Sequence, residues 1–207
     1  MAALTHILYL HGFRSSPKSM KSQMLGQAVQ AWSQRTGQAI NWTAPQLPPS
    51  PAQTVALLRQ TVADWPVDTM TVIGSSLGGF YATVLAEQLG CRAAVINPAV
   101  LPARDLARYI GEQTNFHDPQ DRFFFRPEFI DELQTLAPHP ITRPERYWAL
   151  IAKGDEVLNW QEMVAHYTPH NPGVALTLLE GSDHAVSDFD QHMPSLLSWL
   201  GLATTPA

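Results

Sequence analysis

Residues 74–78 have the sequence Gly-Ser-Ser-Leu-Gly, and this short stretch decides the fold. It follows an apolar, strand-like run at residues 70–73 and precedes a helix-like run at residues 80–86. Gly74 and Gly78, two residues before and after Ser76, permit a turn that is too crowded for larger side chains. The pattern predicts a sharp strand-to-helix turn that exposes the Ser76 hydroxyl beside the free N–H groups of a helix N-terminus. A glycine-rich turn without chemistry is the alternative.

The composition indicates one compact domain over residues 1–207. Hydrophobic residues make up 45% of the chain, enough for a sizeable core, and the net charge of -5 argues against a nucleic-acid-binding surface. The single cysteine, Cys91, excludes an internal disulfide, favours a structural thiol and is typical of a reducing compartment. Because residues 1–10 lack the features of a signal peptide and no apolar run is long enough to span a membrane, we expect a cytoplasmic protein.

Strand-like and helix-like segments alternate, which predicts an α/β fold with a mostly parallel sheet of about six strands and helices on both faces. The expected strands are residues 7–10, 39–43, 70–74, 93–97, 147–152 and 174–179. The expected helices are residues 18–34, 77–89, 159–166 and 188–200, together with one that begins at Pro51 and has Ser50 as its N-cap. Residues 98–144 contain no strand-like run, only helical segments near 104–110 and 127–136, and we interpret them as a short lid-like insertion.

The later loops supply candidates for an acid and a base. A serine hydroxyl is a weak nucleophile until a base removes its proton. In open α/β sheets such groups lie beyond the carboxyl ends of strands, and Asp155 and His184 each follow one of the later predicted strands. We therefore predict Ser76 as the nucleophile, His184 as the base and Asp155 as the acid that orients the imidazole. Glu156 remains an alternative acid.

The loop after the first predicted strand is expected to help form an oxyanion hole. The backbone N–H of Leu77, next to the nucleophile, is one predicted donor, and the N–H of Phe13 is the other. Gly12 lets this loop approach the reacting carbonyl closely. We expect His11 to support the loop by hydrogen bonding rather than to act as a second base.

We expect no metal site and no organic cofactor. His166 and His170 have a spacing that a metal could use, but Thr168-Pro169 would break the helix needed to place them on one face. The other histidines are expected to be packed, solvated or locally bonded: His6, His117, His139 and His192.

These motifs resemble those of the YqiA-like esterases, a small bacterial branch of the α/β-hydrolases, over nearly the whole chain. The matching blocks are residues 9–13, 15–17, 74–82, 97–100, 111–115 and 154–158 and the turn from Gly181 to His184. The resemblance implies an α/β-hydrolase fold, a triad of Ser76, Asp155 and His184, and esterase or thioesterase action on acyl esters, with acyl-CoA as one candidate. Arg14 departs from the family pattern, which leads us to expect a small polar residue there.

The segment 98–144 is rich in phenylalanine and arginine, which allows two interpretations. The aromatic side chains could line an acyl pocket while one or two arginines bind a phosphate or carboxylate of the substrate. We favour instead an insertion anchored by its aromatics, with its arginines paired to nearby carboxylates. Residues 111–115 are expected to form a defined turn.

The expected partner is a small-molecule acyl ester or thioester. Two other functions remain open, namely a peptidase or amidase that uses the same three residues, and a non-catalytic binding protein on a hydrolase scaffold.

Overall fold

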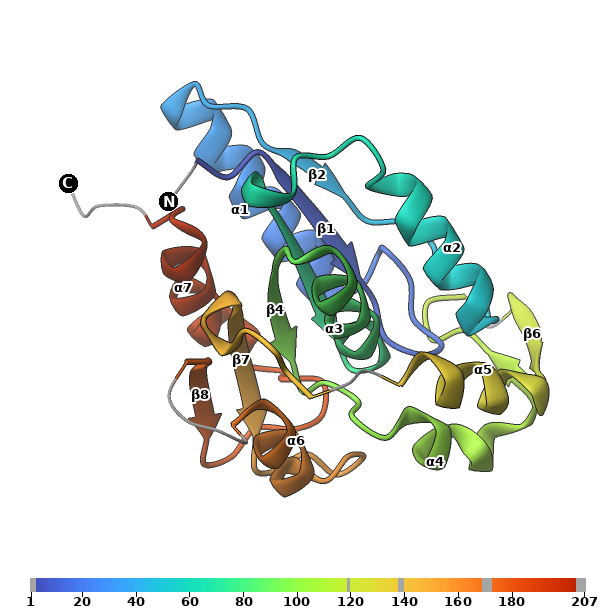
Figure 1. Ribbon diagram of the computed structural model, residues 1–207. Helices are drawn as coiled ribbons and strands as arrows, with labels where there is room; N and C mark the ends of the chain where they lie inside the picture. Colours follow the sequence, from blue (N-terminus) through green and yellow to red (C-terminus); the bar gives the residue numbers. More distant parts are fainter. Residues whose placement is uncertain (1–2, 119, 138–139, 169–172, 204–207) are drawn as a thin grey trace.

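A six-stranded sheet with the strand order β2-β1-β3-β4-β7-β8 crosses the molecule (Figure 1). The computed structural model describes residues 3–118, 120–137, 140–168 and 173–203. The strands are β1 (His6–Leu10), β2 (Asn41–Thr43), β3 (Met70–Ser75), β4 (Arg92–Ile96), β7 (Tyr147–Ala152) and β8 (Ala175–Leu179). All neighbouring pairs in this sheet are parallel, which confirms the predicted mostly parallel α/β sheet.

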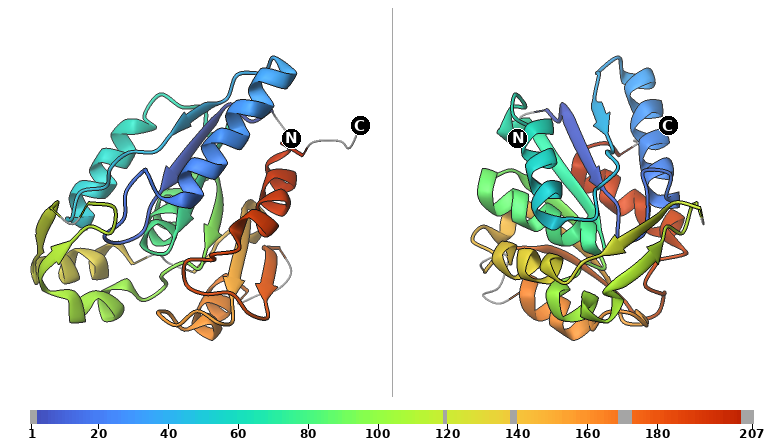
Figure 2. Two further views of the ribbon diagram at one scale, coloured as in Figure 1. Left: turned by 180° about the vertical axis from the view of Figure 1, so that it is seen from behind. Right: turned by 90° about the vertical axis from the view of Figure 1, so that its right-hand side faces the viewer.

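Helices cover both faces of the sheet, as Figure 2 shows. On one face lie α1 (Met20–Thr36) and α7 (Phe189–Leu200), and on the other lie α2 (Pro51–Thr61), α3 (Leu77–Leu89) and α6 (Trp160–Tyr167). Successive residues of β1 point to opposite faces, so that Ile7 and Tyr9 join the core under α1 while Leu8 and Leu10 join the core under α3. Both faces are therefore apolar, as expected for a buried parallel sheet.

Local sequence signals explain the start of α2. Ser50 caps the helix, because its hydroxyl accepts a hydrogen bond from the Gln53 N–H at 3.2 Å, and Pro51 occupies the first position. The first long helix, α1, begins two residues later than predicted, at Met20.

The segment between β4 and β7 corrects two predictions. It contains α4 (Pro102–Leu106), a short 3-10 helix (Ala107–Tyr109), α5 (Glu128–Leu136) and an antiparallel pair, β5 (Gly111–Thr114) and β6 (Arg122–Phe125). The prediction of no strand in 98–144 is therefore wrong, and the expected turn at 111–115 is mostly strand. Strands of four residues are too short to show a reliable periodicity. The residues of β5 are polar, and the strand conformation comes from its backbone pairing with β6.

This insertion lies near the carboxyl ends of β1, β3 and β4 (Figure 1). Aromatic stacking attaches it to the loop after β1. The ring of Phe13 contacts those of Phe123 and Phe125, with centroids 5.9 and 5.1 Å away, and Phe129 packs on Phe125 at 5.5 Å. Phe123, Phe125 and Phe129 therefore anchor the insertion, as the favoured interpretation proposed, whereas Phe116 and Phe124 are exposed.

Two further properties concern the molecule as a whole. Burial raises the pKa of the Cys91 thiol to about 12, so this side chain is protonated and unreactive at neutral pH. Within the described residues, every helix is too short or too polar to cross a membrane.

Candidate active site

Ser76 occupies a strained turn between β3 and α3. Its φ of 56° is rare for a residue with a side chain. A Cβ atom on Gly74 would lie 2.1 Å from the carbonyl oxygen of Gly78, and one on Gly78 would lie 2.0 Å from the carbonyl oxygen of Leu10. Only glycine fits at these two positions, because the clashing atoms belong to the backbone.

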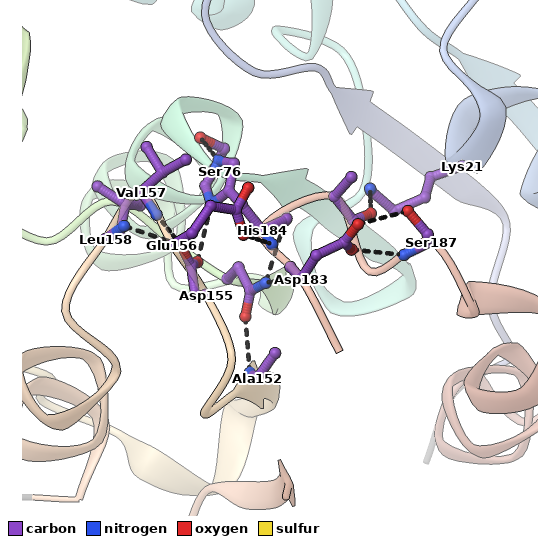
Figure 3. A network of polar contacts seen from close by, with 12 residues as sticks. Lys21, Ser76, Ala152, Asp155, Glu156, Val157, Leu158, Asp183, His184 and Ser187 are labelled. Carbon is purple, nitrogen blue, oxygen red and sulfur yellow. Dashed lines mark hydrogen bonds and ion pairs between the residues drawn. The ribbon is translucent and has the colours of Figure 1, made fainter. Parts of the chain in front are cut away.

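The structure brings Ser76, His184 and Asp155 together in one chain of hydrogen bonds (Figure 3). Ser76 Oγ lies 3.0 Å from His184 Nε2, and His184 Nδ1 lies 2.7 Å from Asp155 Oδ2. The Asp155 side chain is fully buried, and its Oδ1 accepts hydrogen bonds from the N–H groups of Val157 and Leu158, both at 2.8 Å. With Nδ1–H donating to the carboxylate, Nε2 is free to accept the Ser76 proton.

Glu156, the alternative acid, has a different place. Its Oε2 accepts a hydrogen bond from the backbone N–H of His184 at 2.9 Å, whereas the imidazole ring faces Asp155. A Cβ on Gly154 would lie 2.2 Å from the carbonyl oxygen of Ser182, so the loop with the acid packs directly against the loop with the base. Glu156 thus helps to hold the position of His184 without touching its ring.

Asn97, which the sequence reasoning gave no role, connects these two loops. It follows β4 directly, is fully buried and has a φ of 40°. Its Oδ1 accepts the Ala152 N–H at 2.8 Å, and its Nδ2 donates to the carbonyl oxygens of Asp183 and His184, both at 3.1 Å. An asparagine at the end of a strand, where positive φ is tolerated, was the available signal.

Lys21 on α1 is a second residue that sequence reasoning missed. Its buried ammonium donates to the carbonyl oxygen of Ala185, next to His184, and burial lowers its pKa to about 8 (Figure 3). Nearby, the Asp183 carboxylate accepts hydrogen bonds from the hydroxyl and the backbone N–H of Ser187 at 2.6 and 2.8 Å, and these lower its pKa. The loop that carries the base is therefore fixed from both ends.

The loop after β1 passes directly beside Ser76. A Cβ on Gly12 would lie 3.2 Å from the Cβ of Ser76. Among the described residues, the structure gives no hydrogen-bond acceptor to the N–H of Phe13 or of Leu77. Both N–H groups are thus available for an oxyanion on a substrate bound at Ser76.

His11 holds this loop in place. Its Nδ1 lies 2.9 Å from the carbonyl oxygen of Gly12, and its Nε2 accepts the Leu47 N–H at 3.1 Å, so Nδ1 carries the proton. Burial lowers the pKa of His11 to about 4. The neutral ring bridges the predicted oxyanion loop and the proline-rich loop before α2.

Acidification is expected to destabilise the protein through His11. The unfolded chain binds a proton at this residue near pH 6.5, whereas the native state does so only near pH 4, so stability falls as the pH drops through this window. Between pH 7 and pH 4.5 the loss from this residue amounts to about 2–3 kcal/mol. Urea unfolding at both pH values, on wild type and His11→Gln, measures it. Equal losses in the two proteins would contradict the expectation.

A cavity of about 140 Å³ opens beside Ser76 and His184. Its apolar wall comes largely from the insertion, through Pro102, Leu106 and Tyr109. A second cavity, of about 330 Å³, lies on the other side of Phe13 and Leu77. A larger one, of about 610 Å³, is lined by the amino ends of β3 and β4 and by the end of α7, and it contains none of the candidate catalytic residues.

The remaining predictions concern charges and metals. Arg104 forms ion pairs with Asp105 and Glu162 at 2.8 and 2.7 Å, which agrees with the interpretation that the arginines of the insertion pair with carboxylates. Among the described residues, the other arginines of the insertion form no such ion pair. The described chain has no group of three or more His, Cys, Asp or Glu side chains arranged to hold a metal ion. His139 and His170 lie outside the described residues.

Solved structures with the same architecture come from several organisms. Alpha/beta hydrolase domain-containing protein 10 from mouse is 18% identical, with a TM-score of 0.65 over 97% of this chain and 92% of that one. A putative hydrolase from Agrobacterium vitis S4 is 15% identical, with a TM-score of 0.70 over 96% and 90%. Est1E from Butyrivibrio proteoclasticus is 16% identical, with a TM-score of 0.65 over 97% and 88%.

At these identities the likeness shows the fold, which is that of the α/β-hydrolases. The assignment to a family comes from the sequence, because the model of one protein family matches residues 6–201. The chain therefore belongs to the uncharacterised protein family UPF0227, the YqiA-like family.

Proposed function

We propose that this protein is a serine hydrolase that cleaves acyl esters or thioesters through a covalent acyl-enzyme. The observation that carries the proposal is the hydrogen-bond chain from Ser76 through His184 to the buried Asp155. Structural relatives described as a putative hydrolase and as esterases support the same chemistry. The buried, unpaired Cys91 supports a reducing, cytoplasmic location.

The geometry supports the following sequence of steps. His184 Nε2 takes the hydroxyl proton while Ser76 Oγ attacks the substrate carbonyl carbon, and Asp155 stabilises the resulting imidazolium. The N–H groups of Leu77 and Phe13 donate to the oxyanion, and each such donor typically contributes about 3–4 kcal/mol to lowering the barrier. The imidazolium then protonates the leaving alcohol or thiol, and a water activated by His184 releases the acid. None of these steps calls for a cofactor.

Labelling with a fluorophosphonate, followed by peptide mapping, tests the proposal. Wild type is expected to gain one adduct on Ser76 and to hydrolyse p-nitrophenyl butyrate and butyryl-CoA, because an activated serine reacts with both kinds of acyl donor. Ser75→Ala is the matched control, since Ser75 is the adjacent buried serine and the His184 ring bonds to Ser76 and Asp155 instead, and it should label normally. A folded wild type that neither labels nor hydrolyses would favour a non-catalytic binding protein.

A further inference from the structure

Arg14, which follows the predicted oxyanion residue Phe13, is held in an unusual conformation. Its φ is 59°, in a region that arginine rarely adopts. The insertion maintains this backbone, because the Phe116 N–H donates to the carbonyl oxygen of Arg14 at 2.8 Å. Strain of this kind is concentrated at functional sites, where the surrounding structure maintains it.

The Arg14 side chain is fixed at one edge and open at the other. Its Nε donates to the carbonyl oxygen of Thr114 at 2.8 Å, and its guanidinium lies over the ring of Phe116, 4.5 Å from the centroid. The described residues provide no carboxylate partner and no acceptor for its two terminal nitrogens. The guanidinium is therefore oriented in advance, with the part that binds carboxylate or phosphate in two parallel bonds left free.

The charges around the cavity beside Ser76 favour an anion. Besides His184, the residues with charged side chains that line it are Arg14, Arg108 and Asp105. The Asp105 carboxylate is already engaged by Arg104 at 2.8 Å, and Arg108 lies over the ring of Tyr109. Arg14 also borders the second cavity, where Asp121 accepts a hydrogen bond from Asn115 at 2.5 Å. The cavity with the nucleophile is thus lined by two cations without a bound carboxylate, in a protein whose net charge is -5.

We propose that Arg14 is a specificity-determining residue that binds an anionic group of the substrate, so that the preferred substrates are acyl esters or thioesters bearing a carboxylate or phosphate. This inference rests on the proposed hydrolase function. Because Arg14 and Ser76 line the same cavity, one bound substrate can place its scissile carbonyl at Ser76 and its anionic group at Arg14.

Two matched substrate pairs distinguish the source of the anion. The mono-p-nitrophenyl ester of adipic acid and p-nitrophenyl hexanoate have the same number of acyl carbons and differ in a terminal carboxylate. S-butyryl-4′-phosphopantetheine and S-butyryl-pantetheine have the same acyl group and differ only in one phosphate on the leaving group. Steady-state kcat and KM are measured for all four substrates with each protein.

In Arg14→Gln, kcat/KM for the anionic member of at least one pair is expected to fall about 10- to 100-fold, mainly through KM, because a charge-assisted bidentate contact is lost. The neutral members should change less than about threefold, as expected when chemistry is untouched. Arg14→Lys, which keeps the charge without the fork, should lie between. Arg14→Asn provides a variant that tolerates positive φ, should Arg14→Gln fold poorly.

Arg59→Gln is the matched control for the general loss of one positive charge, because Arg59 lies on α2 with its guanidinium bound to Gln88. It should leave all four substrates unchanged. Equal losses on neutral and anionic substrates, or no loss on either anion, would overturn the assignment of Arg14 while the hydrolase function stands. A wild type that hydrolyses none of the four would overturn the hydrolase function and this inference with it.

Discussion

Ser76→Ala is expected to lower kcat/KM for p-nitrophenyl butyrate by at least about 10⁴-fold, because no other side chain can form the acyl-enzyme. The hydroxyl that lies 3.0 Å from His184 Nε2 is removed, while the Cβ that packs beside Gly12 remains. Alanine is subject to the same backbone strain as serine at a φ of 56°, so the turn should persist. The loss should therefore fall on the chemistry and leave the fold intact.

Two measurements separate these effects. Hydrolysis of p-nitrophenyl butyrate gives the loss of activity, and urea unfolding gives the stability, which should stay within about 1 kcal/mol of wild type. Ser75→Ala, the buried neighbour, should retain activity and shows that the loss belongs to one hydroxyl. A Ser76→Ala protein with more than about one hundredth of wild-type activity would contradict an acyl-enzyme at this residue.

Asn97→Ala should produce the second largest effect. The substitution removes three hydrogen bonds, and it leaves the buried Ala152 N–H and the part-buried carbonyl oxygen of His184 without their partner, whereas the Asp183 carbonyl oxygen keeps the Val186 N–H at 3.0 Å. Each unpaired group costs about 1–3 kcal/mol, and water entry would recover part of this. We expect a destabilisation of about 3–5 kcal/mol and, in the protein that remains folded, a loss of kcat of about 100-fold as the imidazole loses its position.

Urea unfolding and the pH profile of kcat measure the two effects separately. A positioning role predicts a changed apparent pKa in the pH profile, because the contact between His184 and Asp155 loosens, whereas a purely structural role predicts an unchanged profile. Asn97→Asp keeps the acceptor for Ala152 but replaces the donor, so it should disturb the base more than the acid. Asn41→Ala, at an exposed position on β2, is the control and should be nearly neutral.

The sequence predicts the sheet and the three central residues of the site for the same physical reason. Parallel strands end at a common edge, so that residues following different strands meet there without any local sequence signal of contact. Ser76 follows β3, while Asp155 and His184 lie in the loops after β7 and β8. Knowledge of the strand order was not needed to propose that they meet.

The parts that the sequence does not predict depend on contacts across long separations. The hydrogen bond from Lys21 to the carbonyl oxygen of Ala185 joins residues that are 164 positions apart in the chain, and the sequence around neither residue predicts it. The β5–β6 pair forms because the backbone N–H and C=O groups of two short segments bond to each other. The sequence of either segment alone does not predict this pairing. The sequence marks Arg14 only as a departure from a family pattern, whereas its contacts with Thr114 and Phe116 depend on the fold of the insertion.

In the described part of the chain, residues other than glycine that have a positive φ are confined to one region of the protein. Among the described residues other than glycine, such angles occur after β1, after β3, directly after β4 and in the loop after β8, at Arg14, Ser76, Asn97, Ser182 and Val186. Glycine would relieve each of them by roughly 1 kcal/mol or more, yet each side chain makes contacts that glycine would lose. Laboratory evolution for heat resistance alone would therefore favour glycine at Ser76, whose hydroxyl serves the proposed chemistry, and not at Asn97, whose side-chain hydrogen bonds stabilise the loops. Variants selected in that way would gain thermal stability and lose catalytic activity, so a thermostability screen of this protein has to measure turnover as well.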